Sequence, residues 1–260
     1  MRELERDLVH PSDSTIAIVG SGRAGSSLAL AAKNAGLDVR LAGRDDALEA
    51  CRGADAALLC VPDDAITEAC QRCATLGDET PGLVGHVSGA STLAVLDAAN
   101  RAGSATFSMH PLQTFPDGTT SVAEMPCAIA GSSPAAERFA EDLAYALGMR
   151  PFEVAEEHRA AYHAAASIAS NLLVALEESA AELLARAGVE DARELLAPLV
   201  LQTAANWAER GAKALTGPIA RGDAATVERH LEVISEIAPE LLAAYETLAE
   251  RAAETRKATA

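Results

Sequence analysis

The chain has 260 residues, 49% of them hydrophobic, so it can fill the core of one large or two modest domains. Its formal net charge of −17 argues against nucleic acid and anionic membranes as partners, and 3% aromatic residues leave little for stacking on bases. No segment is apolar enough to span a membrane, and residues 1–14 form a polar tail without the apolar core of a secretory signal.

Five scattered cysteines, an odd number, are typical of reduced thiols, so we expect a cytoplasmic protein. Cys70 and Cys73 have the spacing of metal ligands, but no second ligand pair follows them. We therefore predict no metal site.

A glycine-rich turn near the start of the chain is the strongest functional signal. The apolar run Ile16–Val19 enters a Gly-x-Gly-x-x-Gly sequence, and an alanine-rich helical run leaves it. Such a strand, turn and helix start form a dinucleotide-binding motif, in which the glycines allow a tight turn and a close approach of the pyrophosphate. The free N–H groups of the helix start attract anions. The predicted cofactor-binding residues of this turn are Gly20, Ser21, Gly22, Arg23, Ala24 and Gly25.

The next strand, Asp38–Arg44, indicates which dinucleotide binds. Its end normally carries a carboxylate that accepts hydrogen bonds from the ribose 2′-hydroxyl of NAD. Here Gly43 and Arg44 come first, and a guanidinium suits a 2′-phosphate. We therefore predict NADP(H) rather than NAD(H), although Arg44 could also be an ordinary surface residue. Residues that follow the strand Ala54–Val61, namely Val61 and Pro62, are predicted to border the cofactor.

Further strands place polar side chains at the same edge of the sheet. Ser88 follows the strand Leu83–Val87, where its hydroxyl either points into the crevice or caps a helix. His110 follows the strand Ala105–Met109, where it either donates a proton or hydrogen-bonds its own loop. Further elements are predicted at Pro126–Gly131 (strand), Pro134–Leu147 (helix) and Pro151–Val154 (strand).

From residue 156 the strand pattern gives way to long alanine- and leucine-rich helices, so we predict a dinucleotide-binding domain over 15–155 and a helical domain over 156–260. The first helix, His158–Ala187, places His163, Ser167 and Asn171 four residues apart on one face. This polar stripe either faces the crevice or is bonded within the core.

The remaining helices have recognisable ends. Asp191 and Glu194 resemble a capping box, Pro198 is predicted to start a fresh helix through Trp207, and a rigid loop over 215–223 follows. In that loop Arg221 could pair with a substrate carboxylate, and Asp223 is predicted to cap the next helix. Further helices are predicted at Ala224–Ile237 and Pro239–Arg256.

Four stretches resemble a known group of proteins: Gly20–Gly25, His110–Phe115, Tyr162–Asn171 and Thr216–Asp223. They resemble Rossmann-like oxidoreductases whose C-terminal half is a domain of unknown function. These belong to the superfamily of 6-phosphogluconate, β-hydroxyacid, ketopantoate and pyrroline-carboxylate reductases. The resemblance covers nearly the whole chain. It implies an α/β fold with a Rossmann-type, mostly parallel sheet, an all-helical C-terminal domain and NAD(P)-dependent oxidoreductase activity.

One departure from this superfamily affects the chemistry. Many relatives carry a lysine four residues before an asparagine on the first helix of the helical half. Asn171 fits the asparagine, but Ser167 stands at the lysine position, and none of the three lysines of the chain lies on that helix. A proton would have to come from His110 or His163. The His110-Pro111 pair also resembles prephenate dehydrogenases, which act on a different acid.

These observations predict an NADPH-dependent oxidoreductase that reduces a small carbonyl acid, with 2-ketopantoate as the named candidate because some members of the group resemble an alternative ketopantoate reductase. The predicted catalytic residues are His163 or His110 as the acid, Asn171 and Ser88 to orient the carbonyl, and Arg221 to bind the carboxylate. Two alternatives stay open: an NADP(H)-binding sensor without turnover, and an imine reductase resembling pyrroline-carboxylate reductase. The apolar helices predict a homodimer through the helical domain.

Overall fold

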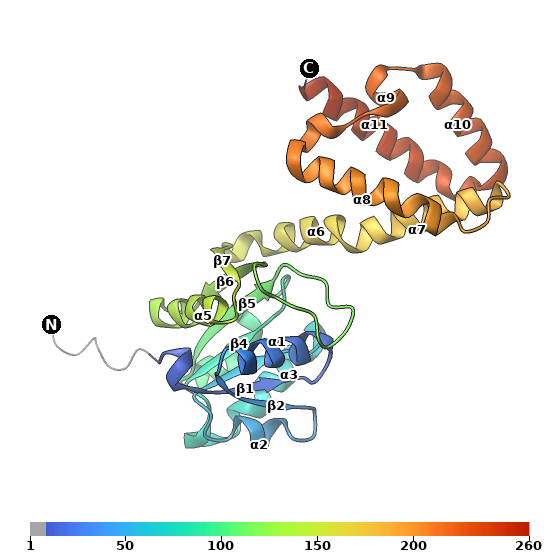
Figure 1. The fold of residues 1–260 in the computed structure, drawn as a ribbon. Helices are drawn as coiled ribbons and strands as arrows, with labels where there is room; N and C mark the ends of the chain where they lie inside the picture. The colour runs from blue at the N-terminus through green and yellow to red at the C-terminus, as the bar shows by residue number, and fades with distance from the viewer. Residues whose placement is uncertain (1–8, 260) are drawn as a thin grey trace. The chain divides into compact units, whose positions relative to one another are not determined.

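The computed structural model describes residues 9–259, so the first eight residues of the predicted polar tail lie outside the described part. Two compact units make up the chain, the first ending at Ser167 and the second beginning at Ile168 (Figure 1). The predicted boundary between residues 155 and 156 lies earlier in the chain than this division and stays a prediction. Within the described residues, no helix has both the length and the hydropathy that a membrane crossing needs.

The first unit is built on a seven-stranded sheet with the order β2-β1-β3-β4-β5-β6-β7. Strands β2 to β5 are parallel to one another, β6 pairs antiparallel with β5, and β7 runs parallel to β6. The chain order reverses between β1 and β3, which is the point where such sheets bind ligands. The strands are β1 (Thr15–Val19), β2 (Asp38–Ala42), β3 (Ala56–Leu59), β4 (Leu83–His86), β5 (Ala105–Pro111), β6 (Pro126–Gly131) and β7 (Arg150–Glu153).

Helices cover both faces of this sheet. Alternate residues of β1 point to opposite sides, so Ile16 and Ile18 join one apolar core while Ala17 and Val19 join the other. The first core also contains residues of α1 and α5, and the second contains residues of α2, α3 and α4. The helices are α1 (Arg23–Asn34), α2 (Ala47–Cys51), α3 (Ile66–Ala74), α4 (Asp97–Arg101), α5 (Pro134–Ala146) and α6 (Arg159–Ala169), with short 3₁₀ turns η4 (Leu93–Leu96) and η5 (Glu156–His158).

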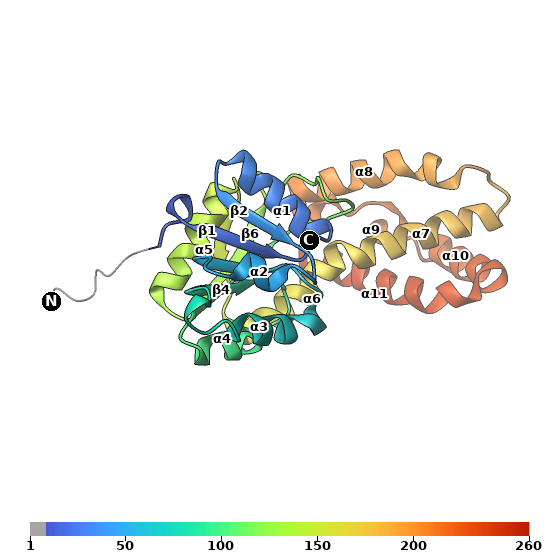
Figure 2. The ribbon, with the colours of Figure 1, turned by 90° about the horizontal axis from the view of Figure 1, so that it is seen from below.

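The second unit is helical, as predicted. Helix α7 packs against α8 and α10, and α11 packs against α9 and α10 (Figure 2). The helices are α7 (Asn171–Arg186), α8 (Ala192–Arg210), α9 (Gly217–Arg221), α10 (Ala224–Ile237) and α11 (Leu242–Thr259). Asp223 caps α10 as expected, because its side chain accepts a hydrogen bond from the Thr226 N–H.

Four local predictions in this helical part were wrong. The helix expected over 158–187 is interrupted at Ser170, whose backbone leaves the helical region at φ −130° and ψ −78°. Pro198 starts no new helix but lies inside α8. Asp191 precedes α8 with a left-handed backbone (φ 54°) and makes no side-chain capping bond. The loop predicted over 215–223 contains the short helix α9.

Candidate nucleotide-binding and catalytic site

The three glycines of the first turn have different surroundings, so the reason for a glycine differs among them. Gly20 has a φ of 119°, and a side chain there would overlap the Cys60 carbonyl. A side chain on Gly25 would overlap the Gly20 carbonyl, so Gly25 lets α1 lie against the turn. Gly22 is different, because a Cβ built on it would meet no described atom within 4 Å. The protein's own packing therefore leaves room for a side chain at Gly22 and does not explain the glycine.

The start of α1 provides hydrogen-bond donors beside that open space. Gly22 is the N-cap residue and has no side chain to cap the helix. The first bond within the helix runs from the Ser26 N–H to the Gly22 carbonyl at 2.9 Å. The N–H groups of Arg23, Ala24 and Gly25 come before it, where a helix has donors to offer an anion.

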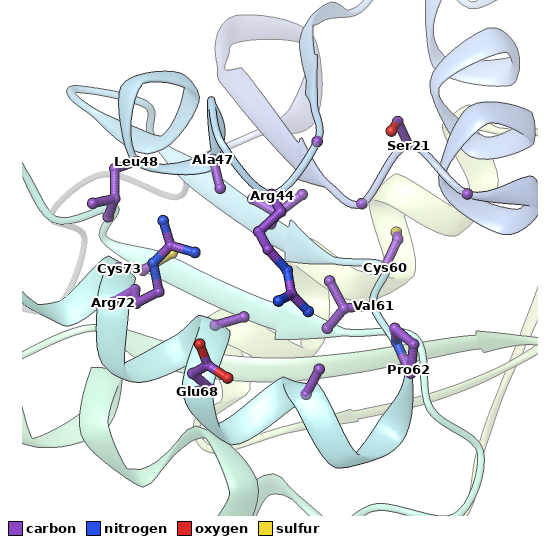
Figure 3. Close-up of a pocket in the computed structure, with 16 residues that line it drawn as sticks. Ser21, Arg44, Ala47, Leu48, Cys60, Val61, Pro62, Glu68, Arg72 and Cys73 are labelled. Atoms are coloured by element: carbon purple, nitrogen blue, oxygen red, sulfur yellow. The ribbon is translucent and has the colours of Figure 1, made fainter.

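A pocket of about 240 Å³ opens beside this turn (Figure 3). Seven of the predicted cofactor-binding residues line it, namely Gly20, Ser21, Gly22, Gly43, Arg44, Val61 and Pro62. The other three, Arg23, Ala24 and Gly25, belong to the helix start itself rather than to the pocket wall. Seven predicted residues thus lie in one pocket wall at the carboxyl ends of β1, β2 and β3, and their role in cofactor binding stays a prediction.

Two arginines enter the pocket from different elements. Arg44 follows β2 and Arg72 lies on α3, and both side chains point into the pocket (Figure 3). Neither guanidinium makes a hydrogen bond or ion pair with any residue between 9 and 259, although the chain carries 38 acidic residues. Glu68 on α3 is the carboxylate in the lining. The sequence analysis missed Arg72, because an arginine in the middle of an ordinary helix carries no local signal.

A second polar cluster lies at the carboxyl ends of β4 and β5. The Nδ1 atom of His110 and the hydroxyl of Tyr162 are hydrogen-bonded at 2.7 Å. The rings of His110 and His163 lie edge to face with their centroids 6.1 Å apart. Gly89 packs against both imidazoles, since a Cβ there would lie 2.8 Å from His110 Nε2 and 2.9 Å from His163 Cδ2. The structure therefore brings together both predicted histidines and adds Tyr162.

Burial determines the protonation of this cluster. It lowers the pKa of His110 to about 4, with further lowering by His163 and Arg159 and a small opposing effect of Asp63. Burial also raises the pKa of the Tyr162 hydroxyl to about 12. At neutral pH both groups are therefore uncharged. The expectation that His110 supplies a proton as an imidazolium is thus disfavoured, which leaves His163 as the predicted acid.

The Ser88 hydroxyl is hydrogen-bonded within the turn that follows β4. Its Oγ accepts hydrogen bonds from the N–H groups of Ala90 at 3.2 Å and Ser91 at 3.0 Å, and it lies 3.1 Å from Ser91 Oγ. The hydroxyl thus binds local backbone, whereas the two sequence interpretations were a position in the crevice and a helix cap. The helical segment that follows begins after Thr92, so Ser88 caps the turn rather than a helix.

The remaining predicted catalytic residues lie in the second unit. Asn171 begins α7 and Arg221 ends α9, and both are exposed. The break at Ser170 separates Asn171 from His163 and Ser167, which lie on α6, so the predicted stripe is not one continuous helical face. The roles of Asn171 and Arg221 stay predictions.

The fold is a Rossmann-type sheet followed by a helical part, as predicted. Residues 125–252 match a family described as a domain of unknown function (DUF2520), in the half of the chain where the resemblance placed such a domain. No curated protein matches the chain.

Solved structures agree on the fold. BF3122 from Bacteroides fragilis, provisionally named an NADP oxidoreductase, is 23% identical with a TM-score of 0.77, and the match covers 94% of this chain and 99% of that one. Protein TM1727 from Thermotoga maritima is 20% identical with a TM-score of 0.73 and the same coverage. Pyrroline carboxylate reductase from Plasmodium falciparum, determined with NADP bound, is 17% identical with a TM-score of 0.60, again covering 94% and 99%.

Proposed function

We propose that this protein is an NADP(H)-dependent oxidoreductase that reduces a small carbonyl acid. The observation that carries the proposal is the open space over Gly22, bordered by the start of α1 and by a pocket with two guanidinium groups that form no hydrogen bond or ion pair within residues 9–259. A fold that also occurs in a pyrroline carboxylate reductase with NADP bound supports it. The named candidate substrate is 2-ketopantoate.

The residues present fit this cofactor. The N–H groups at the start of α1 would hold the pyrophosphate, and Gly22 would let it approach the backbone. Arg44 and Arg72 would bind the 2′-phosphate through charge-assisted hydrogen bonds. When bound, the nicotinamide supplies or accepts a hydride, and the protein supplies geometry and a proton.

His163 is the proposed proton donor. A carbonyl oxygen that is reduced to a hydroxyl needs a proton, and general acids of this kind contribute about 10²–10⁴-fold to the rate. Neutral His110, held by Tyr162, would act as a hydrogen-bond donor or acceptor rather than as the acid. We expect His163→Gln to lower kcat by about that factor while leaving NADPH affinity unchanged.

Binding to NADPH and NADH is the primary test. Each charge-assisted bond is worth about 1.5–3 kcal/mol, so Arg44→Ala and Arg72→Ala should each weaken NADPH binding by about ten- to a hundredfold and leave NADH binding nearly unchanged. Arg101→Ala is the matched control, because Arg101 pairs with Asp97 away from the pocket. Failure of the intact protein to bind either dinucleotide, measured by fluorescence titration, would remove the whole proposal.

Turnover tests the activity separately. NADPH consumption across a panel of 2-oxo acids should reveal a substrate, and Arg221→Met should raise its KM if Arg221 binds the carboxylate as predicted. NADPH binding without turnover of any carbonyl or imine would favour the cofactor-binding sensor instead.

Imine reduction is the second candidate function, and the state of His110 favours it. Carbonyl reduction needs an acid, but His110 is neutral at pH 7 and no lysine lies on α6. A protonated imine accepts hydride without a further proton. Oxidation of NADPH by a cyclic imino acid, unaffected by His163→Gln, would assign the protein to this activity.

A further inference from the structure

Arg159, the first residue of α6, has a side chain with no exposure to solvent. Its guanidinium donates hydrogen bonds to three partners: from Nε to Glu156 Oε1 at 3.0 Å, from Nη1 to the Ser88 carbonyl at 3.2 Å, and from Nη2 to Ser108 Oγ. These partners belong to η5, to the turn after β4 and to β5. One buried side chain thus joins three segments at the carboxyl edge of the sheet.

The turn after β4 is held from both sides. The Ser88 N–H donates to His86 Nδ1 at 3.1 Å, and the Ser88 carbonyl accepts from Arg159. The next residue, Gly89, is the one whose backbone packs against the imidazoles of His110 and His163. The two bonds to Ser88 therefore fix how closely Gly89 approaches those rings.

Burial of the charged Arg159 side chain has a desolvation cost that a neutral side chain at this position would not have. Removing a guanidinium from water costs several kcal/mol unless its partners compensate. Its carboxylate partner Glu156 is itself part of the same framework, since Glu156 Oε2 accepts a hydrogen bond from the Leu93 N–H at 2.7 Å. An apolar side chain could fill the same volume without that cost. Packing alone therefore does not explain why an arginine, with its hydrogen bonds and positive charge, occupies this position.

We propose that Arg159 is a positioning residue of the reaction. It clamps the Ser88–Gly89 turn against His110 and His163 and sets a permanent positive charge beside the imidazoles. This inference rests on the proposed reductase function, but its structural part does not depend on turnover. Arg159 itself is fully buried, so we assign it no direct contact with substrate.

The charge acts on both buried histidines. After burial, Arg159 is the next cause that lowers the pKa of His86 to about 4, while the Thr92 backbone and Asp63 oppose it. For His110, the charged or titratable neighbours are His163, Arg159 and Asp63, together with His86 and the hydrogen-bonded Tyr162. Removal of Arg159 would therefore leave burial and His163 to hold His110 neutral.

Two substitutions separate geometry from charge. Arg159→Met removes both. Arg159→Lys keeps the charge but lacks the planar guanidinium whose two Nη atoms bond Ser88 and Ser108 at the same time. Arg150→Met is the matched control, because the Arg150 side chain donates its hydrogen bond to the Glu124 carbonyl at the sheet edge, on β7 and away from the histidines. Three quantities are measured: the titration of histidine ring protons by NMR without cofactor, the through-space NMR contact between Gly89 and His110, and kcat with the Kd for NADPH.

With Arg159→Met we expect the pKa of His110 to rise measurably but to stay below its usual value, because burial and His163 remain. We also expect the contact to Gly89 to weaken and kcat to fall by about a hundredfold, as a misplacement of 1 Å can cause. With Arg159→Lys we expect the Gly89–His110 contact to weaken and kcat to fall as in the methionine variant. The pKa of His110 should stay low, because the positive charge is kept. The Kd for NADPH should change less than about twofold in both. Rescue of the contact and kcat by lysine would overturn the clamp, and an unchanged titration in the methionine variant would overturn the role of the charge.

If Arg159→Met does not fold, Ser108→Ala provides the second test, because it removes one acceptor of the guanidinium and leaves the charge in place. We expect a weaker Gly89–His110 contact and a lower kcat with an unchanged pKa, and wild-type values for both would overturn the clamp. If wild-type protein binds NADPH but reduces nothing, the reductase function fails while the two NMR measurements still decide the structural proposal.

Discussion

Single residues carry most of the functional argument, and the glycines of the first turn are the clearest case. Gly20 and Gly25 are required by neighbouring carbonyls, but Gly22 faces open space. A residue that the fold does not need, at the start of a helix that attracts anions, points to a ligand. Substitution of each glycine can therefore distinguish the positions needed for folding from the position proposed for ligand binding.

Substitution of these glycines separates the two roles. Gly22→Ala should leave the free energy of unfolding within about 0.5 kcal/mol of wild type, because its Cβ meets nothing, but should weaken NADPH binding. Gly25→Ala should destabilise the protein by about 1–3 kcal/mol, because its Cβ overlaps a backbone carbonyl. Urea unfolding and NADPH titration measure both effects. Equal NADPH affinity in wild type and Gly22→Ala would contradict the assignment of the turn.

The buried histidines predict how stability depends on pH. His86 is fully buried and its pKa in the native state is about 4, against about 6.5 in the unfolded chain. Between these values the unfolded state binds a proton that the native state does not. The free energy of unfolding therefore falls as the pH falls from about 6.5 to about 4, by up to about 3 kcal/mol for this residue.

His86→Asn tests this dependence. An asparagine carbonyl can accept the hydrogen bond from the Ser88 N–H in place of Nδ1, but it does not titrate. The difference in unfolding free energy between pH 7 and pH 4.5 should therefore be smaller in the variant than in wild type. Urea denaturation at both pH values measures it, and identical pH dependence in the two proteins would show that His86 is not protonated on unfolding.

At the scale of elements, the helices of the second unit show where local signals fail. Pro198 is a strong helix breaker in isolation, yet it lies inside α8, and Ser170 interrupts a run that alanine and leucine would continue. Packing of α7 against α8 and α10 outweighs these local preferences. The interior proline is therefore a weak point of α8.

Replacement of this proline should stabilise the protein. Pro198 lacks an N–H for the Glu194 carbonyl, and its side chain is exposed, so little packing would be lost. Pro198→Ala should raise the free energy of unfolding by about 1–3 kcal/mol, which thermal unfolding would detect as a higher Tm. The alanine variant at exposed Glu194 is the control, with an expected change under about 0.5 kcal/mol. A lower Tm for Pro198→Ala would mean that the proline contributes to the stability of α8 despite its missing N–H.

At the scale of the whole molecule, the second unit exposes many large apolar side chains. Leu199, Leu201 and Trp207 on α8 are 64%, 71% and 66% exposed, and Leu199 and Leu201 lie on different sides of that helix. Large exposed apolar patches on a protein surface commonly mark sites of protein–protein contact. This exposure supports the prediction that a second copy of the chain packs on the helices.

Oligomeric state tests that prediction. The wild-type protein should sediment as a dimer at micromolar concentration, and Leu199→Glu should shift it toward the monomer, because an unpaired carboxylate would be buried in the interface. Leu30→Glu is the matched control, since Leu30 is an exposed leucine of α1 in the first unit. A monomeric wild-type protein would refute the predicted dimer.

The amino-acid sequence by itself determined the alternating sheet, the glycine turn, the helical second half and most of the pocket wall. These features depend on neighbours in the chain, since strand, turn and helix signals are local. Only the tertiary structure brought Arg72 beside Arg44, placed Tyr162 on His110 and buried Arg159 under the Ser88 turn. Those pairs are distant in the sequence, and the low pKa of His110 results from their burial, which no local pattern records.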